Sequence, residues 1–186
     1  MAMPTLVRRW TRDEVLALPE DGIRYELIDG ELLVTPSPRK VHQDAVAALV
    51  REIDPFVRAR GIGEMSISPA DLELRPGEIY QPDLFVTALV DGKPARDWAD
   101  LPIPLLVVEI SSPGTARYDR VIKRPAFQAA GVAEFWIVDL DSRVVERWRP
   151  GDDRPEVLID RLRWDPAGTS DGLEIDLRLL FSALLD

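Results

Sequence analysis

The stretch that decides the fold runs from Pro104 to Phe127 and reads PLLVVEISSPGTARYDRVIKRPAF. It opens with an apolar run, Leu105 to Val108, whose β-branched composition is typical of a strand buried on both faces. The strand ends on Glu109, and a Ser-Ser-Pro-Gly-Thr loop leads into a helical pattern that carries Asp119 and Lys123. A buried carboxylate is costly unless it is paired or holds a metal. The stretch therefore predicts a buried strand that ends on an acid, followed by a helix that carries a lysine.

A second acid stands at a neighbouring predicted strand. Asp83 lies in the sequence QPDLFV, directly before the short apolar run Leu84 to Val86. Two carboxylates on neighbouring strands, with Lys123 on the next helix, are the parts of a divalent-metal phosphodiesterase site. Each residue also has a plainer interpretation: Asp83 as a turn acid after proline, Glu109 as a buried partner of an arginine such as Arg117, and Lys123 as an i,i+4 partner of Asp119 on a solvated helix face.

Composition sets limits on the class of protein. The chain has 186 residues, of which 46% are hydrophobic, so residues 1–186 are expected to form a single globular domain. The absence of cysteine excludes disulfides and thiolate sites and favours a reducing compartment, and no apolar run reaches the ~20 residues needed to cross a bilayer. We therefore expect a cytoplasmic protein without a membrane segment. The net charge of -10 disfavours indiscriminate binding to DNA.

The chain alternates between strand and helix patterns. An Asp29-Gly30 turn between apolar runs predicts an N-terminal hairpin, and Thr11-x-x-Glu14 predicts a capped short helix before it. A long helix is expected at about Val41 to Arg60, kinked or split by Pro55. The remaining expected elements are strands at Glu64–Leu74, Tyr80–Thr87, Leu105–Ile110, Phe135–Val138, Val144–Trp148, Val157–Leu162 and Leu173–Leu177, and helices at Asp119–Ala130 and Leu179–Leu185. This order predicts an α/β fold with a mixed central sheet.

Six sequence blocks occur in a recognisable order. They are YELIDGEL, PSP followed by HQ, PDL, VVEISSP, D-x-x-x-K, and GVxEFWIVD. Together, from about Trp10 to Trp148, they resemble the bacterial putative restriction endonuclease family of the PD-(D/E)XK nuclease superfamily. The resemblance implies a restriction-endonuclease-like αβββαβ core. The superfamily pattern has lysine two residues after the acid, where this chain has Ser111. The resembled family shows the same displaced lysine, here Lys123.

The resemblance also implies roles for individual residues. Asp83, Glu109 and the carbonyl of Ile110 would bind Mg²⁺ or Mn²⁺, and Lys123 would lie near the scissile phosphate. Glu31, which precedes the core, would reach the metal through water. Clustered acids repel one another, so at least one of Glu31, Asp83 and Glu109 is expected to have a raised pKa in the absence of metal.

Three further polar residues have weaker signals. His42, the sole histidine, opens the long helix and either faces the site or makes only a local hydrogen bond. Glu26 alternates with apolar neighbours and is expected to face solvent or to be structural. Asp71 lies between apolar residues of a predicted strand and is a further candidate for the site.

The leading hypothesis is a divalent-metal-dependent endonuclease that acts on DNA as a homodimer, because double-strand cleavage by a domain of this size requires two copies. Two alternatives stay open. One is a non-catalytic module of the nuclease fold that binds a protein or nucleic-acid partner. The other is a metal-dependent hydrolase whose substrate is not DNA.

Overall fold

A six-stranded mixed sheet forms the centre of the molecule, with strand order β3-β4-β5-β6-β7-β8. The computed structural model describes residues 8–19, 21–35, 37–166 and 171–186. The sheet strands are β3 (Gly63–Ile67), β4 (Leu84–Ala88), β5 (Leu106–Ser111), β6 (Glu134–Asp139), β7 (Val144–Trp148) and β8 (Glu156–Leu158). Only the β5–β6 pair is parallel within this described sheet. A parallel pair needs a crossover, and the helical segment from Ala116 to Ala129 supplies it.

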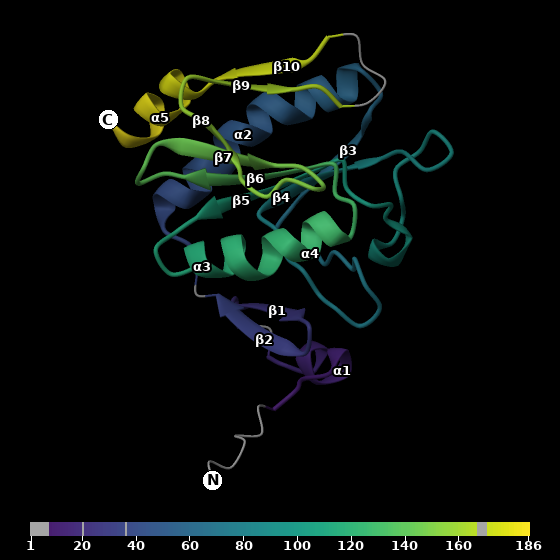
Figure 1. Ribbon diagram of the computed structural model, residues 1–186. Coiled ribbons are helices and arrows are strands. Elements are labelled where there is room, and N and C mark those ends of the chain that lie inside the picture. Colours follow the sequence, from purple (N-terminus) through teal and green to yellow (C-terminus); the bar gives the residue numbers. More distant parts are fainter. Residues whose placement is uncertain (1–7, 20, 36, 167–170) are drawn as a thin grey trace.

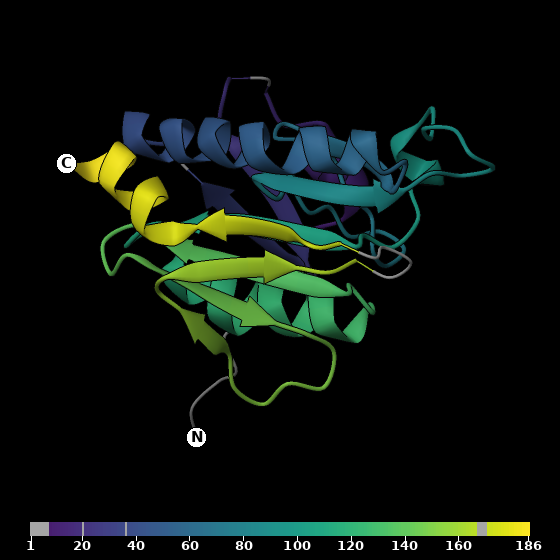
Figure 2. The same cartoon turned by 90° about the horizontal axis from the view of Figure 1, so that it is seen from above.

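Helices cover both faces of this sheet, as Figure 1 shows. Helix α2 (Lys40–Ala59) packs its fully buried Leu49, Ile53 and Val57 against one face. That side also holds β9 (Arg161–Trp164), β10 (Leu173–Asp176) and helix α5 (Leu177–Leu185), which lie close to α2 in both views (Figures 1 and 2). The other face carries α3 (Ala116–Tyr118), a π-helical turn η2 (Asp119–Lys123) and α4 (Arg124–Ala129), with Phe127 in the core. The predicted restriction-endonuclease-like α/β architecture is confirmed.

The N-terminal hairpin forms a separate two-stranded sheet below the α4 layer in Figure 1. Strands β1 (Arg24–Ile28) and β2 (Glu31–Thr35) pair antiparallel around Asp29 and Gly30, both with positive φ, as the Asp-Gly signal predicts. Helix α1 (Arg12–Leu16) precedes them with the expected capping box of Thr11 and Glu14. Two backbone hydrogen bonds of 2.8 and 2.9 Å between Leu27 and Ile79 tie the hairpin to the core.

Several predicted boundaries were wrong for local reasons. Helix α2 is not split at Pro55, and Ile53 and Val57 on either side of that residue are buried. The strand expected over Glu64–Leu74 ends at Ile67. The strand expected from Tyr80 begins only at Leu84, since Pro82 has no N–H for a ladder.

Two further segments differ from their predicted form. The single strand expected over Val157–Leu162 is divided between β8 and β9, which belong to different sheets. The loop over residues 91–102 contains a 3₁₀ turn, η1 (Trp98–Asp100). No helix in the described part of the chain has both the length and the apolar character needed to span a bilayer.

Candidate active site

The two predicted metal-ligating acids lie opposite each other at the end of β4 and on β5. In the antiparallel register Leu84 pairs with Val108, so one residue further along Asp83 faces Glu109. Directly opposed residues have Cβ atoms about 4.5–5.5 Å apart and point to the same face of the sheet. Both side chains are buried, and both line one cavity. Like charges placed in this way repel, so their juxtaposition calls for a cation.

Asp83 is held as an ionised carboxylate by three donors. Arg24 donates to its Oδ1 at 2.8 Å, the Ile110 N–H donates to its Oδ2 at 2.7 Å, and His42 Nε2 lies 3.0 Å from Oδ2. Burial by itself raises the pKa of Asp83, but the His42 hydrogen bond and the Arg24 charge outweigh it, so the pKa lies below its ordinary 3.8. Asp83 therefore stays charged in the metal-free protein.

Glu109 behaves in the opposite way. Burial raises its pKa well above the ordinary 4.5, and the charges of Asp83 and Asp119 raise it further, against the lowering effect of Lys123. The expected raised pKa among the clustered acids therefore belongs to Glu109. A buried carboxyl whose pKa is raised in this way readily accepts a proton or a metal ion.

Lys123 is the cation at the centre of the acids. Its Nζ lies 2.8 Å from Glu109 Oε1, 2.8 Å from Glu26 Oε2 and 3.9 Å from Asp119 Oδ1. Burial tends to lower the pKa of Lys123, but the charges of Glu109 and Glu26 raise it above its ordinary value, so the ammonium is permanent. The side chain is only 5% exposed, which excludes the interpretation of Lys123 as half of a solvated helix pair.

The π-helical turn η2 carries two residues of this cluster on one side, as residues four positions apart on a helix do. Asp119 and Lys123 are its first and last residues, and both are buried. A π turn is wider than an α turn and often marks a functional site. Burial raises the pKa of Asp119 to about 6, although Lys123 opposes the shift. Sequence periodicity indicated one regular helix here and could not reveal the extra width.

The hairpin contributes two residues that sequence analysis missed. Glu26 is 1% exposed, with Oε1 accepting from the Gln81 N–H at 2.8 Å and Oε2 against Lys123, so the expectation that it faces solvent was wrong. Arg24, two positions earlier and therefore on the same face of β1, reaches Asp83. The alternation of Arg24, Glu26 and Ile28 with their neighbours was the available signal. This alternation identifies Arg24 and Glu26 as site residues only when the hairpin is known to pack on the core.

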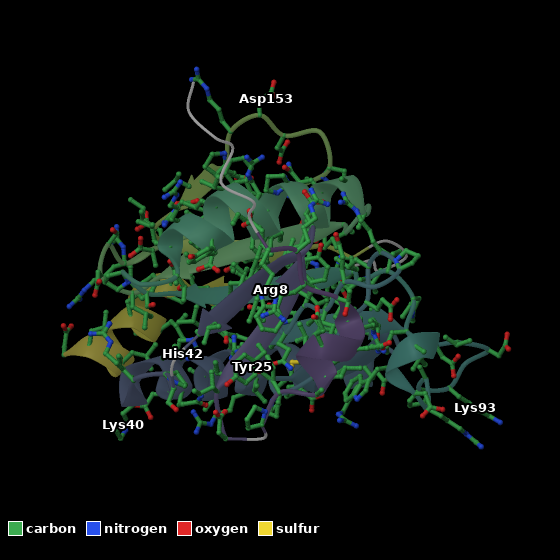
Figure 3. The ribbon with its side chains drawn as sticks, turned by 90° about the horizontal axis from the view of Figure 1, so that it is seen from below. Arg8, Tyr25, Lys40, His42, Lys93 and Asp153 are labelled. Carbon is green, nitrogen blue, oxygen red and sulfur yellow. The ribbon has the colours of Figure 1, made fainter. Side chains whose placement is uncertain are left out.

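The other predicted residues fall into two groups. His42 reaches the site, beside the hairpin that carries Tyr25 in Figure 3, and Ile110 meets Asp83 through its N–H. Glu31 does not reach it: this residue pairs with Ile28 at the turn end of the hairpin, beyond the cavity, and is exposed. Asp71 accepts a 2.7 Å hydrogen bond from Gln81 but does not line the cavity.

The residues that do reach the site line a cavity of about 730 Å³ between the hairpin and the core: Arg24, Glu26, His42, Asp83, Glu109, Asp119 and Lys123. Three buried polar atoms on its wall, His42 Nδ1, Ser111 Oγ and Asp119 Oδ2, have no hydrogen-bond partner within the part of the chain that the structure describes. Folded proteins leave few such atoms unpaired. The cavity is therefore built to receive a polar ligand or water.

The donor set fits a divalent cation by chemistry and by charge. Glu26, Asp83, Glu109 and Asp119 face the two permanent cations Arg24 and Lys123, which leaves a formal excess of two negative charges when all four acids are ionised. Oxygen ligands and negative charge are what Mg²⁺ prefers. As the side chains stand, no three Asp, Glu or His residues of the described ranges form a finished metal site. Instead, Arg24 and Lys123 form ion pairs with the carboxylate oxygens that a metal ion would bind.

Comparison with known proteins identifies the family and a similar fold. The crystal structure of a putative nuclease belonging to DUF820 from Anabaena variabilis is similar, with a TM-score of 0.75 and 27% sequence identity over 95% of this chain and 99% of that one. No curated protein shows significant similarity. The family model described as Uma2, putative restriction endonuclease, matches residues 12–178. The chain therefore belongs to the Uma2 family of putative restriction endonucleases.

Proposed function

We propose that the chain, acting as a single domain over residues 1–186, is a divalent-metal-dependent endonuclease that hydrolyses DNA phosphodiester bonds. Mg²⁺ or Mn²⁺ is the proposed ion. The observation that carries the proposal is the opposed pair Asp83 and Glu109, with Lys123 between the acids and an excess of negative charge on one cavity wall. Family membership and the similar nuclease structure point to the same class of hydrolase.

Asp83 and Glu109 would hold the ion, with the Ile110 carbonyl as a further ligand. When bound, such an ion activates water and neutralises charge on the phosphate. Arg24 and the Ile110 N–H fix the Asp83 carboxylate in place, so its orientation is set before any ligand arrives. His42 adds a third contact from the start of α2 and keeps an unpartnered Nδ1 that lines the cavity.

Lys123 would act on the phosphate itself. Its ammonium is held at the cavity wall by Glu26 and Glu109, with its charge fixed by their carboxylates. A preorganised cation of this kind stabilises negative charge that grows in the transition state, at little reorganisation cost. The position of Lys123 on the cavity wall, 2.8 Å from Glu109 of the opposed acid pair, supports a catalytic site over a non-catalytic module.

Cleavage of plasmid DNA during titration with Mg²⁺ or Mn²⁺ tests the proposal. Wild-type protein should nick or linearise the plasmid only when the ion is present, and chelator should abolish the activity. Glu109→Gln should reduce the rate by about a hundredfold or more, the range for losing one electrostatic group at a reacting centre.

A matched control is Glu31→Gln, which removes an exposed carboxylate from the same hairpin that borders the cavity. It should leave the rate within about twofold of wild type, since single exposed groups outside the site contribute little. Equal rates for wild type and Glu109→Gln at saturating metal would contradict the proposed site. Absence of any metal-dependent cleavage would favour the non-catalytic module.

A further inference from the structure

The rim of the cavity is apolar where its floor is charged. Ile23, Val34 and Tyr118 all line it and are 40%, 53% and 42% exposed. Tyr118 directly precedes Asp119, so the same turn that brings the buried acid to the floor brings an aromatic ring to the rim. An exposed aromatic beside a charged floor is the pattern that accommodates a base and a phosphate together.

Cations available to a long polyanion are scarce at this cavity. Its described lining includes Arg24, Arg39 and Lys123, and two of these are engaged by the site acids. Arg39 is the exposed one, with Asp141 4.0 Å away. A protein that grips duplex DNA through its backbone neutralises about 6–10 phosphates. With a net charge of -10 and one exposed arginine on the rim, this surface is poorly suited to that mode.

The size of the cavity favours a single nucleotide. Sites for small organic ligands span about 300–1,000 Å³, and this one measures about 730 Å³. A base pair inside a duplex cannot enter such a hollow, because its bases are stacked and paired. An unpaired nucleotide can place its base on the rim and direct its phosphate to the floor.

We infer that the site takes an unpaired DNA nucleotide whose base stacks on Tyr118, so that single-stranded DNA is bound in preference to duplex. The inference rests on the proposed function for the position of the phosphate, next to Lys123. Base–aromatic stacking tolerates any base, so the preference is for strand state and not for sequence. Ile23 and Val34 extend the apolar surface around the base.

Binding of a fluorescein-labelled single strand and of the blunt duplex of the same sequence, measured by anisotropy, tests the inference. Ca²⁺, an oxygen-binding divalent ion, replaces Mg²⁺ during the measurement. The single strand should bind at least tenfold more tightly. Tyr118→Ala should weaken single-strand binding by between about five- and one-hundredfold, the range for losing one base–aromatic stack. Tyr118→Phe should retain the affinity, because it retains the ring.

Val121→Ala is the matched control, since Val121 is 58% exposed on the same turn and does not line the cavity. It should bind like wild type. A 2-aminopurine in the strand should lose fluorescence on binding to wild type and Tyr118→Phe but not to Tyr118→Ala. Equal or tighter binding of the duplex, or unchanged affinity in Tyr118→Ala, overturns the inference. Neither result depends on cleavage, so failure of the nuclease proposal would appear separately, as absence of hydrolysis despite binding.

Discussion

Replacing Lys123 by methionine removes the charge at the centre of the acids while keeping an unbranched side chain only one atom shorter. At an effective dielectric constant of about 20, each of its 2.8 Å contacts with Glu26 and Glu109 is worth about 6 kcal/mol before desolvation is counted. The desolvation of a buried ammonium offsets much of this. Breaking a buried ion pair by removing one partner costs about 3–5 kcal/mol net. We expect Lys123→Met to lose about that much unfolding free energy at pH 7 in the absence of metal.

The loss of unfolding free energy is limited, because the acids that have lost Lys123 as a partner can take up a proton. Protonating a carboxyl of ordinary pKa 4.5 costs about 3 kcal/mol at pH 7 and less at lower pH. The folded-state pKa of Glu109 is already raised, and losing Lys123 raises it further. A carboxyl whose pKa is higher in the folded than in the unfolded protein stabilises the fold at acid pH. This stabilisation is lost as pH rises through the folded-state pKa. The deficit of Lys123→Met should therefore shrink toward pH 5 and grow toward pH 8.

Urea unfolding in chelator, followed between pH 5 and pH 8, measures this directly. Lys40→Ala is the control, because Lys40 is 88% exposed in a pair with Asp44 and should cost only a few tenths of a kcal/mol. Added Mg²⁺ should restore more stability to Lys123→Met than to wild type, while plasmid cleavage stays at least about a hundredfold slower. Equal stability of Lys123→Met and wild type at pH 8 without metal would refute the role of Lys123 as countercharge.

Two other outcomes follow from the same contacts, and a third concerns the expected assembly. Asp83→Asn should destabilise the metal-free protein by about 2–3 kcal/mol, because Arg24 loses its charged partner. Since the pKa of Asp83 is lowered, the stability of the wild type in acid unfolding should fall as pH drops below about 3.8, and Asp83→Asn should lack this fall. Glu26→Gln should leave cleavage measurable but weaken the contact between the hairpin and the core, which faster amide hydrogen exchange at Leu27 would show. Unchanged exchange at Leu27 would contradict the role of Glu26 in holding the hairpin at the site. Sedimentation should show a homodimer at micromolar concentration, and a 20.9 kDa species throughout would remove that expectation.

The sequence was sufficient to predict that Asp83, Glu109 and Lys123 lie together, because its signals are local. Asp83 and Glu109 each adjoin a buried apolar run, and the order of strands makes those runs neighbours in the sheet. Lys123 is the lysine that follows them. The apolar patterns likewise predicted most of the central sheet and α2, with errors at strand ends such as that at Pro82 and in the strand expected over Val157–Leu162, which is divided between two sheets.

The remaining site residues depend on contacts that span long stretches of chain. Arg24 reaches Asp83 across 59 positions, and Glu26 reaches Gln81 across 55. Glu26 and Glu31 lie on the same face of the hairpin, and nothing in its sequence says how far along that face the core extends, so Glu31 was preferred to Glu26. The extent of the core along the hairpin decides which of the two acids is buried at the cavity, and this extent depends on tertiary packing.

The wide turn at Asp119–Lys123 restricts how this segment can vary between relatives. Inserting a further residue, which the wide turn could not absorb, would rotate one flank by about 100° relative to the other. Either the acid or the lysine would then leave the cavity, while the apolar face of α4 could still pack through Phe127. The segment should therefore tolerate many substitutions at its exposed Val121 but no added residue. Insertions, more than point changes, are the variation to which this region is sensitive.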